Sequence, residues 1–195
     1  MTNICVIPAR GGSRRIPRKN IRDFFGRPII SYSIETAKAS GLFDRIFVST
    51  DDDEIANISR EYGSEVIMRP ESFSQDEVGT QEVTKHAIEV VQEKLGKVDY
   101  ACCIYATAPM MIVDDLKRGF SLLNYSTMNY AMSVGTEPLR DAGQWYLGYA
   151  SAFLHNWPLI DTLTYMVPIP ANRVCDINTI QDFERAEQMF ANIHK

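Results

Sequence analysis

The chain has 195 residues, of which 45% are hydrophobic and 23% are charged, an ordinary balance for one globular domain. It has 20 basic and 25 acidic residues, a formal net charge of −5, so a broad basic face for nucleic acid is not expected. It contains neither an apolar run long enough to span a membrane nor an apolar leader that follows basic residues. These properties predict a cytoplasmic protein without membrane or nucleic-acid partners.

Strand-like and helix-like segments alternate along the chain. The expected strands are residues 3–8, 45–49, 65–68, 98–105 and 129–135, with further candidates at 144–148 and 165–168. The expected helices lie between them and at the end, at residues 28–40, 51–63, 80–96, 113–125 and from 179 onward. Such alternation predicts a three-layer α/β domain, with helices on both faces of a mostly parallel sheet. No repeat or linker divides residues 1–195, so we expect a single domain.

Helix starts are marked by polar residues that can accept backbone N–H groups. Thr50 or Asp51 is expected to cap the second helix, and Thr80 the third. Thr179 is followed three residues later by Asp182, which approximates a capping box.

The four cysteines have no zinc-ligand spacing and lie in apolar surroundings, so we expect them to be reduced core residues.

The first strand leads into a loop that is rich in positive charge. Its cations are Arg10, Arg14, Arg15, Arg18 and Lys19, and Arg22 follows. Without these six residues the chain would have 14 basic and 25 acidic residues, so the positive charge is concentrated here. Gly11 and Gly12 allow the backbone to approach a ligand closely, and the cations can neutralise phosphates. The loop therefore predicts a polyphosphate site where open α/β sheets bind nucleotides; the alternative is a solvated basic turn.

The order of residues in this loop is more specific than its charge. The segment 7–20, Ile-Pro-Ala-Arg-Gly-Gly-Ser-Arg-Arg-Ile-Pro-Arg-Lys-Asn, resembles the signature of the acylneuraminate cytidylyltransferases, the CMP-sialic acid synthetases. The similarity continues through Ser49-Thr50-Asp51-Asp52, Arg69-Pro70, Gly79-Thr80, Ala106-Thr107-Ala108-Pro109 and Asp176-Ile177-Asn178-Thr179. The run from Asp141 to Tyr146 is most similar to the pseudaminic acid branch of that family.

This resemblance implies a Rossmann-like nucleotide-diphospho-sugar transferase fold and transfer of CMP from CTP to the anomeric hydroxyl of a nonulosonic acid, with release of pyrophosphate. It implies catalytic roles for Arg14, Lys19 and Asp176. Nucleotide-binding roles are implied for Arg10, Gly11, Gly12, Ser13, Asn20, Arg69, Thr80, Ala106 and Thr107. Gln144 and Tyr146 would face the sugar, and Asp176 and Asn178 would hold Mg²⁺. No side chain stands out as the general base.

Several of these residues also have a purely structural interpretation. Thr80 can act only as a helix cap, and the acids of residues 51–54 are favoured as acids in a first helical turn. Trp145 is more readily buried than stacked on a ligand. His86, His155 and His194 have no acidic or cysteine partner nearby in the sequence and are expected to be structural or exposed.

The chain departs from the family pattern in two places. The family has Asp-Ile-Asp at its metal site, whereas this chain has Asp176-Ile177-Asn178; a neutral amide is a poorer Mg²⁺ ligand than a carboxylate. Relatives also carry an arm of a few dozen residues that docks on a second subunit. Here only residues 136–140 take its place, a length that suits a plain turn. A homodimer is therefore possible but would lack this contact.

Two other functions remain open at this point. A catalytically impaired relative that still binds CTP is the main alternative, because of Asn178 and the missing arm. A small nucleic-acid binder that uses the basic loop is the third reading, and the acidic remainder of the chain opposes it.

Overall fold

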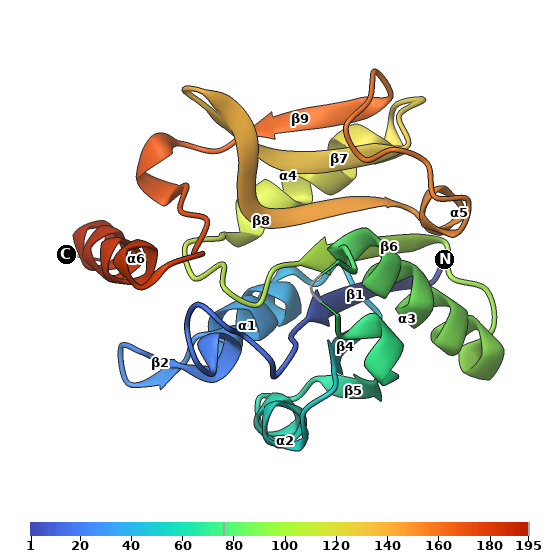
Figure 1. The fold of residues 1–195 in the computed structure, drawn as a ribbon. Coiled ribbons are helices and arrows are strands. Elements are labelled where there is room, and N and C mark those ends of the chain that lie inside the picture. Colours follow the sequence, from blue (N-terminus) through green and yellow to red (C-terminus); the bar gives the residue numbers. More distant parts are fainter. Residues whose placement is uncertain (76, 195) are drawn as a thin grey trace.

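The computed structural model describes residues 1–75 and 77–194. Its main sheet has seven strands in the order β5-β4-β1-β6-β8-β7-β9 (Figure 1). The strands are β1 (Asn3–Pro8), β4 (Arg45–Thr50), β5 (Glu65–Met68), β6 (Tyr100–Ile104), β7 (Tyr130–Thr136), β8 (Leu139–Tyr149) and β9 (Thr164–Pro168). β8 is antiparallel to β6 and β7, and the other neighbouring strands are parallel. The predicted α/β class and mostly parallel sheet are confirmed.

Helices cover both faces of this sheet (Figure 1). Side chains alternate between the two faces of a strand, so Cys5 and Ile7 of β1 face one helical layer and Ile4 and Val6 face the other. The first layer contains α1 (Ile30–Ser40), α2 (Asp53–Glu61) and α4 (Val113–Asn124), and the second contains α3 (Thr80–Leu95) and α5 (Ala150–Leu154). All four of these β1 side chains are fully buried, as expected of a central strand.

The last helix, α6 (Ile180–Ile193), lies to one side of the sheet (Figure 1). It packs on the hairpin of β2 (Asp23–Phe24) and β3 (Arg27–Pro28), where the Phe24 ring meets Phe183 and Phe190 edge to face at 5.6 and 5.3 Å. Its start has the predicted capping box, because Thr179 and Asp182 each accept the other's backbone N–H. This helix anchors the chain just beyond Asp176 and Asn178.

Other predicted helix starts differ from the structure. α1 begins at Ile30 rather than at Pro28, because Pro28 pairs with Asp23 in the β2–β3 hairpin. Asp52 caps α2 by accepting the Ile55 N–H, so the prediction of Thr50 or Asp51 was wrong. Thr80 is the first residue of α3 and its side chain makes no cap.

The short connection at residues 136–140 joins two long strands. β7 and β8 pair as far as Thr136 and Leu139, so the expected plain turn is the tip of a β-hairpin.

All four cysteines are free and buried, as predicted. Among the described residues, no helix has the length and apolar character needed to cross a membrane.

The strand order creates a crevice at one edge of the sheet. The chain proceeds outward from β1 to β4 and β5, and then returns to place β6 on the other side of β1. Where consecutive connections lead to opposite sides of one strand, here β1, they leave a crevice at the carboxyl end of that strand. Open α/β sheets bind their ligands in such a crevice. The basic loop begins at this point, directly after β1.

Candidate nucleotide site

A cavity of about 470 Å³ opens at the carboxyl ends of β1, β5 and β6. It is within the size range of small-molecule sites. Of the residues predicted for the site, those that line it are Arg10, Ser13, Arg14, Lys19, Asn20, Arg69, Thr80, Ala106, Thr107, Asp176 and Asn178. Arg15 adds a fifth cation, whereas Asp176 is the one acidic residue in the described lining. The cavity is therefore strongly electropositive, although the whole chain is acidic.

Arg69 follows β5 and extends into this cavity while remaining 7% exposed. Burial lowers the pKa of its guanidinium, an effect that the nearby carboxylate of Asp51 opposes. Its buried Nε has no hydrogen-bond partner among residues 1–75 and 77–194. A buried donor without an acceptor is costly in a folded protein, so this arrangement favours an acceptor supplied by a ligand.

Lys19 lies in a short 3-10 turn, Lys19–Ile21, and also lines the cavity. Its Nζ donates to the Ile177 carbonyl at 2.6 Å, which directs the ammonium toward the segment of Asp176 and Asn178. Burial lowers the pKa of Lys19; the carboxylate of Asp176 raises it, and Arg15 and Arg10 lower it further. A bound anion would relieve this repulsion between like charges.

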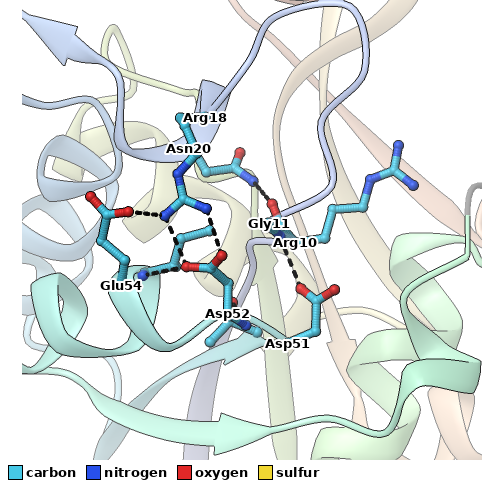
Figure 2. A network of polar contacts seen from close by, with 9 residues as sticks. Arg10, Gly11, Arg18, Asn20, Asp51, Asp52 and Glu54 are labelled. Atoms are coloured by element: carbon cyan, nitrogen blue, oxygen red, sulfur yellow. Dashed lines mark hydrogen bonds and ion pairs between the residues drawn. The ribbon is translucent and has the colours of Figure 1, made fainter.

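The two glycines of the loop, Gly11 and Gly12, lie outside the described lining of the cavity. The Gly11 N–H donates to Asp51 Oδ1 at 2.9 Å and is therefore engaged within the protein. Asn20 is buried, and its Nδ2 donates to the Arg10 carbonyl at 2.9 Å (Figure 2). The predicted contacts of Gly11 and Gly12 with a ligand therefore stay a prediction, and in this structure the cavity is lined on the loop side by side chains that follow the two glycines.

The opposite end of the cavity has a less polar lining. Thr80 is held there by Tyr146, whose hydroxyl donates to Thr80 Oγ1 at 2.8 Å. Ala106 and Thr107 follow β6, and Phe73 adds an aromatic ring. This end offers small side chains, a hydroxyl and a ring, which together suit a nucleoside.

Gln144 and Tyr146, which were expected to face a sugar, are both buried beneath the cavity and outside its described lining. Gln144 Nε2 donates to the Arg173 carbonyl at 2.6 Å, and Tyr146 supports Thr80. Both belong to β8, whose side chains here pack between the sheet and its helices. In this structure both side chains thus contact other protein groups, and their predicted contact with a sugar stays a prediction.

Asp176 and Asn178 lie side by side at the mouth of the cavity, as expected for residues two apart in an extended segment. Asn178 Nδ2 donates to Asp176 Oδ2, and Asn178 Oδ1 accepts from Arg15 Nη2 at 3.2 Å. The amide oxygen thus faces a cation. Among the described residues, no group of three His, Cys, Asp or Glu side chains could hold a metal ion. One carboxylate still suits Mg²⁺, which commonly binds through one or two carboxylates together with substrate phosphates.

Sequence reasoning missed several residues of the cavity. Phe73 ends a short 3-10 turn, Glu71–Phe73, in a polar segment whose sequence has no periodic pattern to indicate it. Tyr105 directly follows β6 and also lines the cavity; its hydroxyl donates to Asp141 Oδ2 at 3.1 Å. Burial raises the pKa of Asp141. Only a folded structure could show this pair, because the two residues are 36 positions apart.

The residues expected to be structural are placed accordingly. Trp145 is fully buried. The His86 ring lies tilted against the Phe73 ring with centroids 4.5 Å apart, and His194 stacks on Phe190. His155 bonds to the Ser151 carbonyl. All three histidines lie outside the described lining of the nucleotide cavity.

The strand order and the electropositive cavity at the carboxyl end of β1 are typical of nucleotide-binding α/β proteins. The model of the cytidylyltransferase family matches residues 4–149, and the chain belongs to this family. It is 36% identical over 229 aligned positions to a pseudaminic acid cytidylyltransferase of Campylobacter jejuni, covering 100% of this chain and 99% of that protein. The predicted enzyme class, a cytidylyltransferase, is confirmed.

Two solved structures support the same fold. A CMP:2-keto-3-deoxy-manno-octonic acid synthetase complexed with CTP has a TM-score of 0.76 at 16% identity, covering 99% of this chain and 100% of that one. A cytidylyltransferase from Leptospira borgpetersenii has a TM-score of 0.74 at 15% identity, covering 98% of this chain and 87% of that one. At these identities, the similarity shows the fold alone.

Proposed function

We propose that this protein transfers CMP from CTP to the anomeric hydroxyl of a nonulosonic acid, most specifically pseudaminic acid, and releases pyrophosphate. The observation that carries the proposal is the cavity at the end of β1, where Arg10, Arg14, Arg15, Lys19 and Arg69 surround one pocket. The full-length similarity to pseudaminic acid cytidylyltransferases supports the choice of sugar.

In this proposal the cations hold the triphosphate at the loop end of the cavity. The sugar hydroxyl attacks the α-phosphorus of CTP, the new P–O bond forms, the bond to pyrophosphate breaks, and the hydroxyl proton passes to solvent water. Phosphoryl transfer depends mainly on positioning and charge neutralisation. Lys19 and Arg14, which line the cavity together with Asp176, are the catalytic cations of this proposal. Thr80, Ala106 and Thr107 bind the nucleoside at the other end.

Asp176 is the residue that would hold Mg²⁺, together with phosphate oxygens of CTP. The ion would supply neutralisation of phosphate charge. Asn178 orients the Asp176 carboxylate through its amide nitrogen, while its amide oxygen accepts from Arg15. Arg15 therefore adds positive charge where the family pattern has a second carboxylate.

The sugar would enter beside Asp176, near the exposed β7–β8 hairpin.

The alignment with the Campylobacter protein has 229 positions against 195 residues here, an excess of 34, which supports the loss of an internal segment. We propose that this segment is the dimerisation arm, missing between about residues 136 and 141. A homodimer of this chain would then need another contact surface. We also propose that the enzyme acts in the cytoplasm.

A pyrophosphate-release assay tests the function. We expect turnover with CTP and pseudaminic acid, slower turnover with other nonulosonic acids, and none with ATP or GTP. The matched control is Arg45→Ala, which removes a surface arginine paired with Glu65 at 3.0 Å, away from the cavity. Binding of CTP without turnover of any sugar acid, with or without Mg²⁺, would contradict the proposal.

A further inference from the structure

Arg18 belongs to the basic loop, but its side chain does not line the cavity. It lies outside the described lining, whereas its neighbour Lys19 is part of it. The Arg18 backbone has a φ of 56°, in the left-handed region. Only a few per cent of residues other than glycine adopt this conformation. The turn sends the side chains of Arg18 and Lys19 in different directions, and Figure 2 shows Arg18 extending toward Asp52 and Glu54.

Asp52 receives Arg18 with favourable geometry. Arg18 Nη1 lies 2.5 Å from Asp52 Oδ2, and Nη2 lies 2.9 Å from Oδ1, a two-point contact between guanidinium and carboxylate. Arg18 Nη2 also contacts Glu54. The hydrogen bond from Arg18 holds the pKa of Asp52 below its usual value. Arg18 and Asp52 are 38% and 22% exposed, so solvent screens the pair only partly.

The preceding residue, Asp51, holds the other end of the same loop. Its Oδ1 accepts the Gly11 N–H at 2.9 Å (Figure 2). Gly11 also packs closely on Asp52, since a Cβ at Gly11 would lie 2.6 Å from Asp52 Oδ2. Two consecutive carboxylates, at the end of β4 and the start of α2, therefore hold the entrance and the exit of the loop. We name the contacts Asp51–Gly11 and Asp52–Arg18 the loop clamp.

Capping alone does not account for this arrangement. Asp52 caps α2 through Oδ1, which accepts the Ile55 N–H at 2.9 Å. A cap needs only an acceptor atom, which asparagine supplies as well as aspartate. The cap explains neither the second oxygen on Arg18 nor the left-handed conformation of Arg18, which costs free energy and persists where surrounding contacts hold it.

We infer that Arg18 is a positioning residue for nucleotide binding: the loop clamp fixes the path of residues 11–18 so that Arg10, Arg14 and Lys19 face the triphosphate. This inference rests on the proposed function. Binding of the nucleotide would otherwise have to order the loop as well, and that ordering would weaken affinity. The clamp therefore acts on CTP without touching it.

Four single variants separate the clamp from simpler explanations. Arg18→Ala removes the guanidinium, and Arg18→Gly removes it but accepts the positive φ without strain. Arg18→Lys keeps the charge but loses the two-point contact. Asp52→Asn keeps an acceptor for the cap of α2 and removes the carboxylate. Arg45→Ala is the control, because it deletes an arginine–carboxylate pair elsewhere on the surface.

Titration calorimetry with CTP and steady-state kinetics are the measurements. We expect Arg18→Ala and Arg18→Gly to weaken CTP binding by about tenfold or more and to raise KM for CTP by the same factor. KM for the sugar acid and the unfolding temperature should change little, and Arg18→Lys and Asp52→Asn should lie between these variants and the wild type. The double variant Arg18→Ala with Asp52→Asn should bind CTP as tightly as Arg18→Ala alone, because both substitutions remove the same Arg18–Asp52 contact.

The possible outcomes distinguish failure of the loop-clamp inference from failure of the proposed function. If the wild type and Arg45→Ala fail to bind CTP, the proposed function fails. If the wild type binds CTP and both Arg18→Gly and Asp52→Asn bind it equally well, the clamp has no positioning role. If Arg18→Ala does not fold, Asp52→Asn and Arg18→Lys still decide the question through their CTP affinities.

Discussion

Lys19 illustrates how a binding site can work against the stability of its own fold. Its ammonium is partly desolvated beside Arg10 and Arg15, and burial lowers its pKa. Replacing Lys19 by Met keeps most of the length of the unbranched side chain but removes its charge. We therefore expect Lys19→Met to abolish CTP binding in calorimetry while the unfolding temperature stays equal to that of the wild type or rises. Loss of folding, or unchanged CTP affinity, would contradict this account of the cavity.

At the residue scale, the sequence indicated the site where its residues are close together along the chain. Arg10, Ser13, Arg14, Lys19 and Asn20 come from one motif and line one cavity wall. The contacts that shape the loop were not predictable in this way. Arg18 binds Asp52, a residue 34 positions away, whereas the acids of residues 51–54 were favoured as acids of a first helical turn. Contacts between distant segments require the fold.

At the scale of elements, the packing of α4 on β8 allows a test. Gly119 of α4 faces Trp145, and a Cβ at Gly119 would lie 2.3 Å from Trp145 Cη2. Overpacking of this kind typically costs about 1–3 kcal/mol, and the helix preference of alanine recovers less than that. Gly119→Ala should thus lower the free energy of unfolding, measured by denaturant titration.

The matched rescue uses the partner of this contact. Trp145→Phe removes the ring atoms that the new Cβ would meet, at the cost of a cavity. We expect the double variant to be more stable than the sum of the two single effects, because the substitutions are in direct contact. Additive effects would show that α4 and β8 do not pack in this way.

The elements themselves were largely predictable, because apolar periodicity and glycine positions determine them locally. Their boundaries were less so. Pro28 was expected to begin a helix, but it pairs in a hairpin that α6 covers. Thr80 was expected to cap α3, but the hydroxyl of Tyr146 engages its side chain. In both cases a tertiary contact overrides a local preference.

At the scale of the whole molecule, strand order unites the site. The return of the chain from β5 to β6 brings Arg69 and Thr107 to the loop that follows β1, and Asp176 closes the cavity from beyond β9. The alternation of strand-like and helix-like segments in the sequence predicted the class of the fold. It did not predict that Gln144 and Tyr146 are buried. Their position depends on β8, which enters the sheet antiparallel between β6 and β7.

The most direct test of the account is to identify the product. The protein is incubated with CTP, Mg²⁺ and pseudaminic acid, and the mixture is analysed by mass spectrometry beside a Lys19→Met control. We predict a conjugate of CMP and the sugar acid, formed in equal amount with pyrophosphate and absent from the control. CTP that binds the wild type but remains intact, or that yields only free CMP, would contradict the claim that this cavity transfers CMP to a sugar acid.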